Sequence, residues 1–213
     1  MHISKVLRNS AGDKIHITDG NGRKFTGIIE QINKNQVVVK SDELVTEERA
    51  WPYITLCIGL IKKRDRLEFA IEKATELGVD EIIVFRGEHS QKQNIRTDRL
   101  QAAALSAMKQ SLRYYLPPVR MAQSLSEVLK GINRDVPVIL ADEIRQSEND
   151  FTEIKQEKLL LIVGPEGGFS EKERELLREI SAVPYSLGKN RLRTETAAVL
   201  MTDRFKNRLF LKS

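Results

Sequence analysis

The sequence of 213 residues is long enough for one ordinary α/β domain together with a small accessory domain. Hydrophobic residues make up 40% and charged residues 31%, and no apolar stretch approaches the roughly 20 residues that cross a bilayer, so we expect no membrane anchor. The formal net charge of +5 is compatible with a polyanionic partner, although basic and acidic residues are closely intermixed.

The cysteine and histidine content argues against a disulfide-stabilised protein and against a metalloprotein. Cys57 is the single cysteine and cannot form an internal disulfide, and its apolar surroundings favour a buried, inert thiol. The histidines His2, His16 and His89 are scattered, and no spacing resembles a metal site. We therefore expect no metal. Residues 1–10 carry charge and lack the apolar core of a secretory signal, so we expect a cytoplasmic protein.

The first part of the sequence is expected to form a small antiparallel β-barrel. Alternating and β-branched residues predict strands at 14–18, 24–32 and 36–40. The segments between them are rich in Asn, Asp and Gly, which tolerate the backbone conformations of tight hairpin turns. A polar stretch then ends at Trp51-Pro52, where the pattern changes. We therefore expect two domains, at 1–51 and 52–213.

The second part alternates apolar strands with amphipathic helices, a pattern typical of an α/β domain with a mainly parallel sheet. In chain order we expect strand 54–61, a helix from about Arg64 to Gly78, strand 79–85, a helix capped by Thr97, strands 136–141 and 159–163, a helix opened by Ser170, strand 184–187 and a final helix from about Thr196. Glu173 lies three residues after Ser170 and completes the sequence pattern of a capping box.

The segment LLIVGPEGGFS at 160–170 leads from a buried strand through a glycine-rich turn to a helix. Glycines let a ligand approach the backbone closely, and ligands of open parallel sheets bind beyond the carboxyl ends of the strands. A tight connection that needs glycine only for its dihedral angles explains the same residues equally well. The phosphate-binding loop of ATPases and the usual dinucleotide fingerprint are both absent, which disfavours those classes.

The segment SLGKNRLRTETAA at 186–198 has the same order of strand, loop and helix, with polar residues concentrated in the loop. Taken alone, Thr194, Glu195 and Thr196 are better explained as helix-capping residues, because hydroxyls cap helices and a carboxylate in the first turn complements the helix dipole.

Together the two segments resemble one family closely. GPEGGFS at 164–170 and LGKNRLRTETA at 187–197 occur in the order and at the separation found in the RsmE family, the 16S ribosomal RNA (uracil-N3)-methyltransferases. The resemblance extends to KATELGV at 73–79, to KQS at 109–111 with Arg113 and Pro117, and to His2 followed by VLR at 6–8. It therefore covers nearly the whole chain.

The resemblance implies a fold, a reaction and partners. The fold is an α/β domain of the SPOUT type, with a trefoil knot and a mainly parallel sheet, preceded by a PUA-like β-barrel for RNA that lacks its usual opening strand. The reaction is S-adenosylmethionine-dependent methylation of N3 of a uridine in the decoding region of 16S rRNA, and we expect the substrate to be the rRNA within the small ribosomal subunit. The enzyme is expected to be a homodimer with its cofactor site beside the subunit interface.

The resemblance also implies which residues bind the cofactor. Two loops contribute them: Val163, Gly164, Pro165, Glu166, Gly167 and Gly168 from the first, and Leu187, Gly188, Leu192, Arg193, Thr194, Glu195 and Thr196 from the second. The family commonly has Pro-Arg and an aliphatic residue after Leu-Gly, whereas this sequence has Lys189-Asn190-Arg191. The basic group is displaced by one position, which leaves open which arginine faces RNA.

Catalysis at N3 of uracil requires loss of a proton and stabilisation of the anion that develops. We expect Arg193 to stabilise this anion, with a phosphate contact as its alternative role. Glu195 is the candidate base, although the N-terminus of a helix stabilises its charged form and weakens it as a proton acceptor. The candidate RNA contacts are Lys5, Arg8, Arg23, Lys24, Arg113 and Arg191.

Two other functions stay open at this point. One is a SPOUT methyltransferase that acts on another RNA, because the fold does not determine the substrate. The other is a non-catalytic RNA-binding or ribosome-assembly factor, which the intact segments at 164–168 and 193–196 disfavour.

Overall fold

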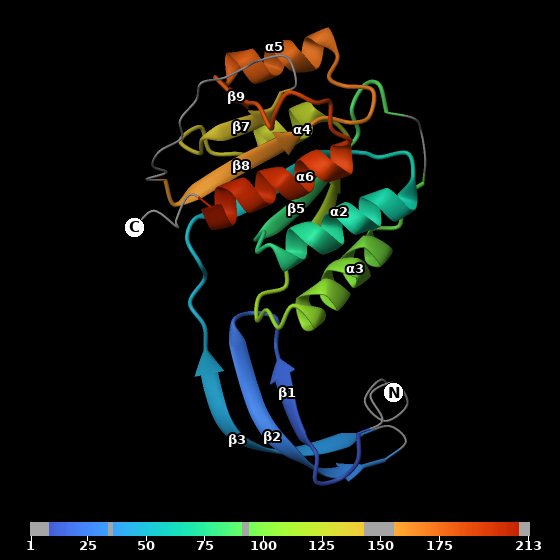
Figure 1. Cartoon of the computed structure of the whole chain (residues 1–213), viewed down its shortest axis with the longest axis vertical. Helices are drawn as coiled ribbons and strands as arrows, with labels where there is room; N and C mark the ends of the chain where they lie inside the picture. The colour runs from blue at the N-terminus through green and yellow to red at the C-terminus, as the bar shows by residue number, and fades with distance from the viewer. Residues whose placement is uncertain (1–8, 34–35, 91–93, 143–155, 209–213) are drawn as a thin grey trace. The chain divides into compact units, whose positions relative to one another are not determined.

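The computed structural model describes residues 9–33, 36–90, 94–142 and 156–208 (Figure 1). They divide into two compact units. The smaller unit contains the described residues up to Arg49 together with Arg113–Tyr115, and the larger unit contains the described residues of 50–112 and those from Leu116 onward. No helix among the described residues is both long and apolar enough to cross a membrane.

The smaller unit is built on a three-stranded antiparallel sheet in the order β1-β2-β3. Its strands are β1 (Lys14–Thr18), β2 (Arg23–Ile32) and β3 (Val37–Thr46). The antiparallel strands are as expected, but β3 continues through 41–46, which the sequence had suggested was a polar linker. These residues pair with the first half of β2 through the backbone, as in the partnership of Arg23 with Thr46, and backbone pairing does not require apolar side chains.

A short segment from between two elements of the larger unit completes this sheet region. The backbone N–H of Gly22, in the β1–β2 turn, donates a 2.9 Å hydrogen bond to the carbonyl of Tyr114. The Tyr115 hydroxyl donates a 2.7 Å bond to the carbonyl of Glu47, and Asn21 forms an isolated bridge with Tyr115. Residues 113–115 are therefore part of the smaller unit in space, although they follow a helix of the larger one.

The larger unit has a six-stranded, fully parallel sheet in the order β6-β5-β4-β8-β7-β9. The strands are β4 (Tyr53–Gly59), β5 (Glu81–Phe85), β6 (Val119–Ala122), β7 (Val138–Ala141), β8 (Lys158–Val163) and β9 (Val183–Tyr185). The sequence reading missed the short strand β6. The expected parallel α/β architecture is confirmed, whereas the threading of the chain into a knot stays a prediction.

Helices cover both faces of this sheet (Figure 1). The helices are α2 (Arg64–Glu76), α3 (Thr97–Gln110), α4 (Leu125–Lys130), α5 (Glu171–Glu179) and α6 (Thr194–Asp203), followed by the π-helical η1 (Arg204–Arg208). One core cluster joins the sheet to α2, α3 and α6, and the second joins it to α4 and α5. The thiol of Cys57 lies in the second cluster, where burial raises its pKa, in agreement with an inert cysteine.

The ends of the helices test the expected caps. At α5, Ser170 and Glu173 form a complete capping box, because the Glu173 amide donates to Ser170 Oγ at 3.1 Å and the Ser170 amide donates to Glu173 Oε2 at 2.8 Å. Thr97 is the first residue of α3 rather than its cap. The sequence reading also missed α4, which Ser124 caps by accepting a hydrogen bond from the Glu127 amide.

Candidate functional site

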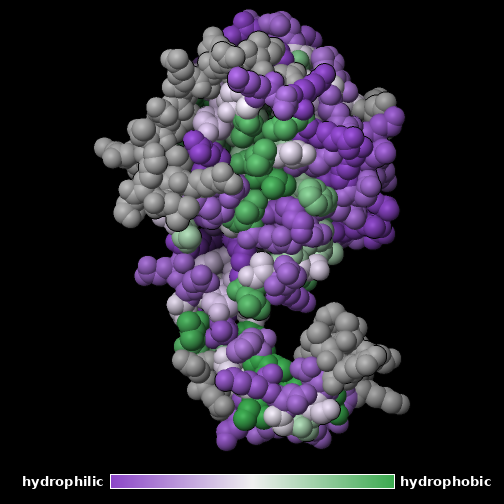
Figure 2. Space-filling model, viewed as in Figure 1, coloured by the Kyte–Doolittle hydropathy of each residue, from purple (hydrophilic) through white to green (hydrophobic). Residues whose placement is uncertain are grey.

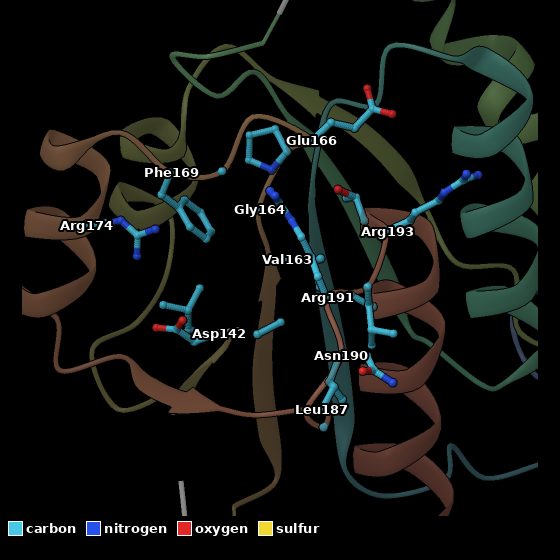
Figure 3. A pocket seen from close by; sticks show the side chains of 18 residues that line it. Asp142, Val163, Gly164, Glu166, Phe169, Arg174, Leu187, Asn190, Arg191 and Arg193 are labelled. Atoms are coloured by element: carbon cyan, nitrogen blue, oxygen red, sulfur yellow. The ribbon is translucent and has the colours of Figure 1, made fainter. Parts of the chain in front are cut away.

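A cavity of about 490 Å³ lies at the carboxyl ends of three neighbouring parallel strands (Figure 3). Because β8, β7 and β9 are adjacent and parallel, the loops that follow them meet at one edge of the sheet. The cavity is lined by Leu140 and Ala141 of β7 and Asp142 after it, by Val163 of β8 and Gly164, Pro165, Glu166, Gly168 and Phe169 after it, by Leu187, Gly188, Asn190, Arg191, Leu192 and Arg193 after β9, by Arg174 of α5, and by Thr194 and Ala197 of α6.

The two predicted loops therefore face each other across this cavity. Of the predicted cofactor-binding residues, all but three line it, and the exceptions are Gly167, Glu195 and Thr196. Both loops contain a glycine with a positive φ, +74° at Gly168 and +134° at Gly188. A Cβ added at either position would meet no atom within 4 Å. Glycine is therefore required at both positions by the backbone conformation rather than by a lack of space.

Of the described residues that line the cavity, five are charged: Asp142, Glu166, Arg174, Arg191 and Arg193. Figure 3 shows Arg174 reaching in from α5 on the same side as Asp142, which directly follows β7. Arg191 extends into the cavity from the opposite loop, whereas the side chain of Arg193 is directed toward α2. The exposed guanidinium of Arg193 forms no ion pair with any residue in the described part of the chain.

Glu166 and Glu195 are both held by one arginine of α2. Arg66 Nη1 lies 3.2 Å from Glu166 Oε1, and Arg66 Nε lies 3.5 Å from Glu195 Oε1. The backbone N–H of Lys62 donates a 3.2 Å bond to the second oxygen of Glu166. The second oxygen of Glu195 is buried and has no hydrogen-bond partner among the described residues. The carboxylate of Glu195 is therefore buried beside Arg66 and does not line the cavity.

The candidate RNA contacts are distributed over both units. Arg23, Lys24 and Arg113 belong to the smaller unit, Arg191 lines the cavity of the larger unit, and Lys5 and Arg8 lie outside the described residues. Arg23 is already engaged, because its Nε lies 2.7 Å from Asp19 Oδ2. The Asn21 amide and then the Arg23 guanidinium hold the pKa of Asp19 below its usual value. Lys24 Nζ lies 5.3 Å from the centre of the Tyr114 ring.

Sequence reasoning missed Asp142, Phe169 and Arg174 as residues of the cavity. Asp142 could have been found, because it follows a predicted strand at the edge where ligands bind. Phe169 adjoins the predicted loop and was left out of it. For Arg174 there was no local signal, since its approach to the cavity depends on how α5 packs against the sheet. The pairing of Arg66 with both loops likewise depends on the tertiary fold.

Comparison with known proteins places these features in a family context. Residues 48–206 match the RNA methyltransferase domain family, and residues 2–40 match the RNA methyltransferase PUA domain family. The chain is 32% identical over 203 residues to the ribosomal RNA small subunit methyltransferase E of Rickettsia conorii, covering 93% of this chain and 82% of the relative.

Two solved structures are similar over almost the whole chain. A probable rRNA-methyltransferase from Porphyromonas gingivalis has a TM-score of 0.83 and 36% identity, covering 96% of this chain and 88% of the other. A ribosomal RNA small subunit methyltransferase E from Neisseria gonorrhoeae, bound to S-adenosyl methionine, has a TM-score of 0.82 and 26% identity. The match covers 97% of this chain and 88% of that one.

Proposed function

This chain belongs to the RNA methyltransferase family, and from that premise we propose that it methylates N3 of one uridine in the decoding region of 16S rRNA, using S-adenosylmethionine. The observation that carries the proposal is the cavity between the two loops of 163–169 and 187–193, since both family motifs contribute to its walls. The overall likeness to ribosomal RNA small subunit methyltransferases E, of which the match covers 82% and 88%, supports the substrate class.

The residues of the cavity fit S-adenosylmethionine. Its volume of about 490 Å³ lies within the range of roughly 300–1,000 Å³ that is usual for small-molecule sites. Gly168 and Gly188 expose backbone groups on the two walls, and Leu187 and Leu192 offer apolar surface for an adenine ring. Asp142 and Arg174 carry the opposite charges that complement an α-ammonium and an α-carboxylate group. When bound, the cofactor supplies a methyl group made electrophilic by a positively charged sulfur.

The protein's own groups must stabilise the uracil anion and orient it. We assign stabilisation of the anion to Arg193, whose exposed side chain borders the cavity and is free of ion pairs with the described residues. Arg191, which extends into the cavity, is assigned to contact with the RNA near the reacting base. We assign no proton transfer to Glu195, because its carboxylate is buried beside Arg66 and is not among the lining residues.

RNA binding outside the active site is assigned to the smaller unit. We place the PUA-like RNA-binding domain at 1–51, joined in space by residues 113–115, and the methyltransferase domain in the remainder of 52–213. The phosphate contacts are assigned to Arg23, Lys24 and Arg113, together with Lys5 and Arg8. The sequence match to the RNA methyltransferase PUA domain family over residues 2–40 supports this division. A substrate within the small ribosomal subunit also implies that the protein acts in the cytoplasm.

A homodimer is the expected assembly. In Figure 2, apolar side chains gather on the face of the larger unit that carries α6, and Leu200 of this helix is exposed. An exposed apolar face of this kind supports a contact between two copies of the chain. The expected dimer would bring a second subunit close to the cofactor cavity.

The proposal is tested by cofactor binding followed by methylation. Isothermal titration with S-adenosylmethionine is expected to give saturable binding at one site per chain. The protein is then incubated with cofactor and either small ribosomal subunits or free 16S rRNA from cells that lack the endogenous activity, and the modified nucleotide is identified by mass spectrometry. N3-methyluridine supports the proposal. Another methylated nucleotide would indicate a different RNA specificity, and absence of cofactor binding would favour a non-catalytic RNA-binding protein.

A further inference from the structure

Arg66 contacts both loops of the cofactor cavity from a third element. It lies in the first turn of α2, and its side chain is 26% exposed. Its guanidinium faces Glu166 of the β8–α5 loop at 3.2 Å and Glu195 of the first turn of α6 at 3.5 Å. Glu166 belongs to the motif segment 164–170, and Glu195 belongs to the motif segment 187–197. One cation therefore connects the two walls of the cavity.

The two carboxylates differ in how much they need Arg66 as a partner. Glu166 is 36% exposed and has a second support, because the Lys62 amide donates to its other oxygen. Water screens such a pair, and its contribution alone is small. Glu195 is only 9% exposed, and its Oε2 has no hydrogen-bond partner among the described residues. A buried carboxylate needs a compensating charge, which here comes from Arg66 and from the N-terminus of α6.

The position of Glu195 in the chain links this contact to the chemistry. Glu195 directly follows Arg193 and Thr194, both of which line the cavity. Glu166 lies between Pro165 and the glycines of the other wall. Fixing the two carboxylates therefore fixes the backbone from which the residues on both sides of the cavity project.

We propose that Arg66 is a positioning residue that holds the two cofactor-binding loops at their working separation through Glu166 and Glu195. This inference rests on the proposed function, because it takes the cavity to be the S-adenosylmethionine site. Arg66 does not line the cavity and acts through the two carboxylates. In this assignment Glu195 contributes as the buried partner of Arg66, which gives a role to a motif residue that does not reach the cavity.

The first test uses the cofactor-free protein and hydrogen exchange measured by mass spectrometry. Arg66→Ala is expected to speed exchange in peptides covering 164–168 and 193–196 together, and Arg66→Lys less so. Arg64→Ala is the matched control, because Arg64 lies in the same helical turn and pairs with Glu68 at 3.5 Å rather than with either loop. Unchanged exchange at both loops in Arg66→Ala would overturn the proposal.

The second test measures cofactor affinity by isothermal titration. Loosening both loops in Arg66→Ala is expected to raise the Kd for S-adenosylmethionine roughly tenfold or more, with Arg66→Lys intermediate and Arg64→Ala within about twofold of the unmodified protein. In Arg66→Ala, the further change Glu195→Gln should recover part of the lost affinity, because an amide can be buried without a compensating cation. This recovery is not expected if Arg66 only stabilises the fold.

The outcomes separate this inference from the function on which it rests. If the unmodified protein fails to bind S-adenosylmethionine, the proposed function is wrong and the inference falls with it. If the unmodified protein binds and Arg66→Ala binds equally well, only the positioning role is overturned. Should Arg66→Ala fail to fold, Arg66→Lys and Glu195→Gln decide the question, and unchanged loop exchange and affinity in both would overturn the proposal.

Discussion

Lys206 Nζ lies 2.8 Å from Asp80 Oδ2, and the side chains of both residues are almost completely buried, at 5% and 3% exposure. Lys206 also donates hydrogen bonds to the carbonyls of Ala50 and Pro52, and Asp80 accepts one from the Ile54 amide. The lysine thus ties η1 to the segment that enters β4 and to the residue that precedes β5. All of its donors have partners, which makes burial of the charge tolerable.

Replacement of this lysine should destabilise the larger unit without removing the cofactor site. Lys206→Met leaves Asp80 and two carbonyls without their cation, and we expect the free energy of unfolding to fall by about 3–5 kcal/mol. Urea denaturation followed by circular dichroism measures this loss. The double variant Lys206→Met with Asp80→Asn should recover part of it. A loss below about 1 kcal/mol, typical of exposed pairs, would mean that the pair is not buried in solution.

Arg191 and Arg193, the two arginines of the second loop that line the cavity, should separate RNA binding from turnover. Arg193→Ala is expected to lower the methylation rate at saturating cofactor by roughly 10²-fold or more, with the Kd for S-adenosylmethionine nearly unchanged, because it removes stabilisation of the anion. Arg191→Ala should instead weaken binding of the RNA and raise its KM. Single-turnover rates and titrations of both variants check this. Equal losses of cofactor affinity and rate in Arg193→Ala would contradict the catalytic assignment.

Arg174 should recognise the amino-acid end of the cofactor. Loss of a charged hydrogen bond costs about 1.5–3 kcal/mol, so Arg174→Ala should weaken binding of S-adenosylhomocysteine about tenfold or more. Binding of 5′-methylthioadenosine, which lacks the carboxylate and the amine, should change little. Arg178→Ala is the matched control, because Arg178 lies one turn further along α5 and pairs with Glu171. Equal weakening of both ligands would show that Arg174 does not contact the amino-acid end.

Affinity for RNA should depend steeply on salt. Each phosphate neutralised by a cation contributes about 0.7–0.9 to the slope of log affinity against log salt concentration. Lys24→Ala should therefore reduce the slope by up to about one unit, and Arg23→Ala by less, because Arg23 is already paired with Asp19. Lys130→Ala in α4 serves as a control outside the candidate set. A slope close to zero for the unmodified protein would reject an interface dominated by phosphate contacts.

Local sequence patterns were sufficient for much of this structure. The buried strands, the capping box at Ser170 and the two glycine-containing loops were all predictable, because each depends on residues within a few positions of one another. The short elements β6 and α4 were missed, since four to six residues give little periodicity. The continuation of β3 was missed because its pairing is made by the backbone.

For the candidate site too, local features were predictable from the sequence and tertiary contacts were not. The order of the motifs indicated which loops would form the cavity, but not which side chains would reach it. Glu195 looked like a cofactor-binding or catalytic residue in the sequence, whereas its carboxylate pairs with Arg66, more than a hundred positions away in the chain. The approach of Arg174 likewise depends on the packing of a helix against a sheet. Contacts of this kind are absent from any local pattern.

The return of the chain through residues 113–115 restricts how such a protein can change by recombination. The smaller unit is not a continuous stretch of sequence, because the β1–β2 turn receives its hydrogen-bond partner from Tyr114, encoded beyond α3. A gene fusion that replaced only the N-terminal residues would place a foreign β-sheet against the original Tyr114-Tyr115 segment. The two parts must therefore be inherited together or adjust to each other, and the small β-sheet unit cannot be exchanged freely on this scaffold.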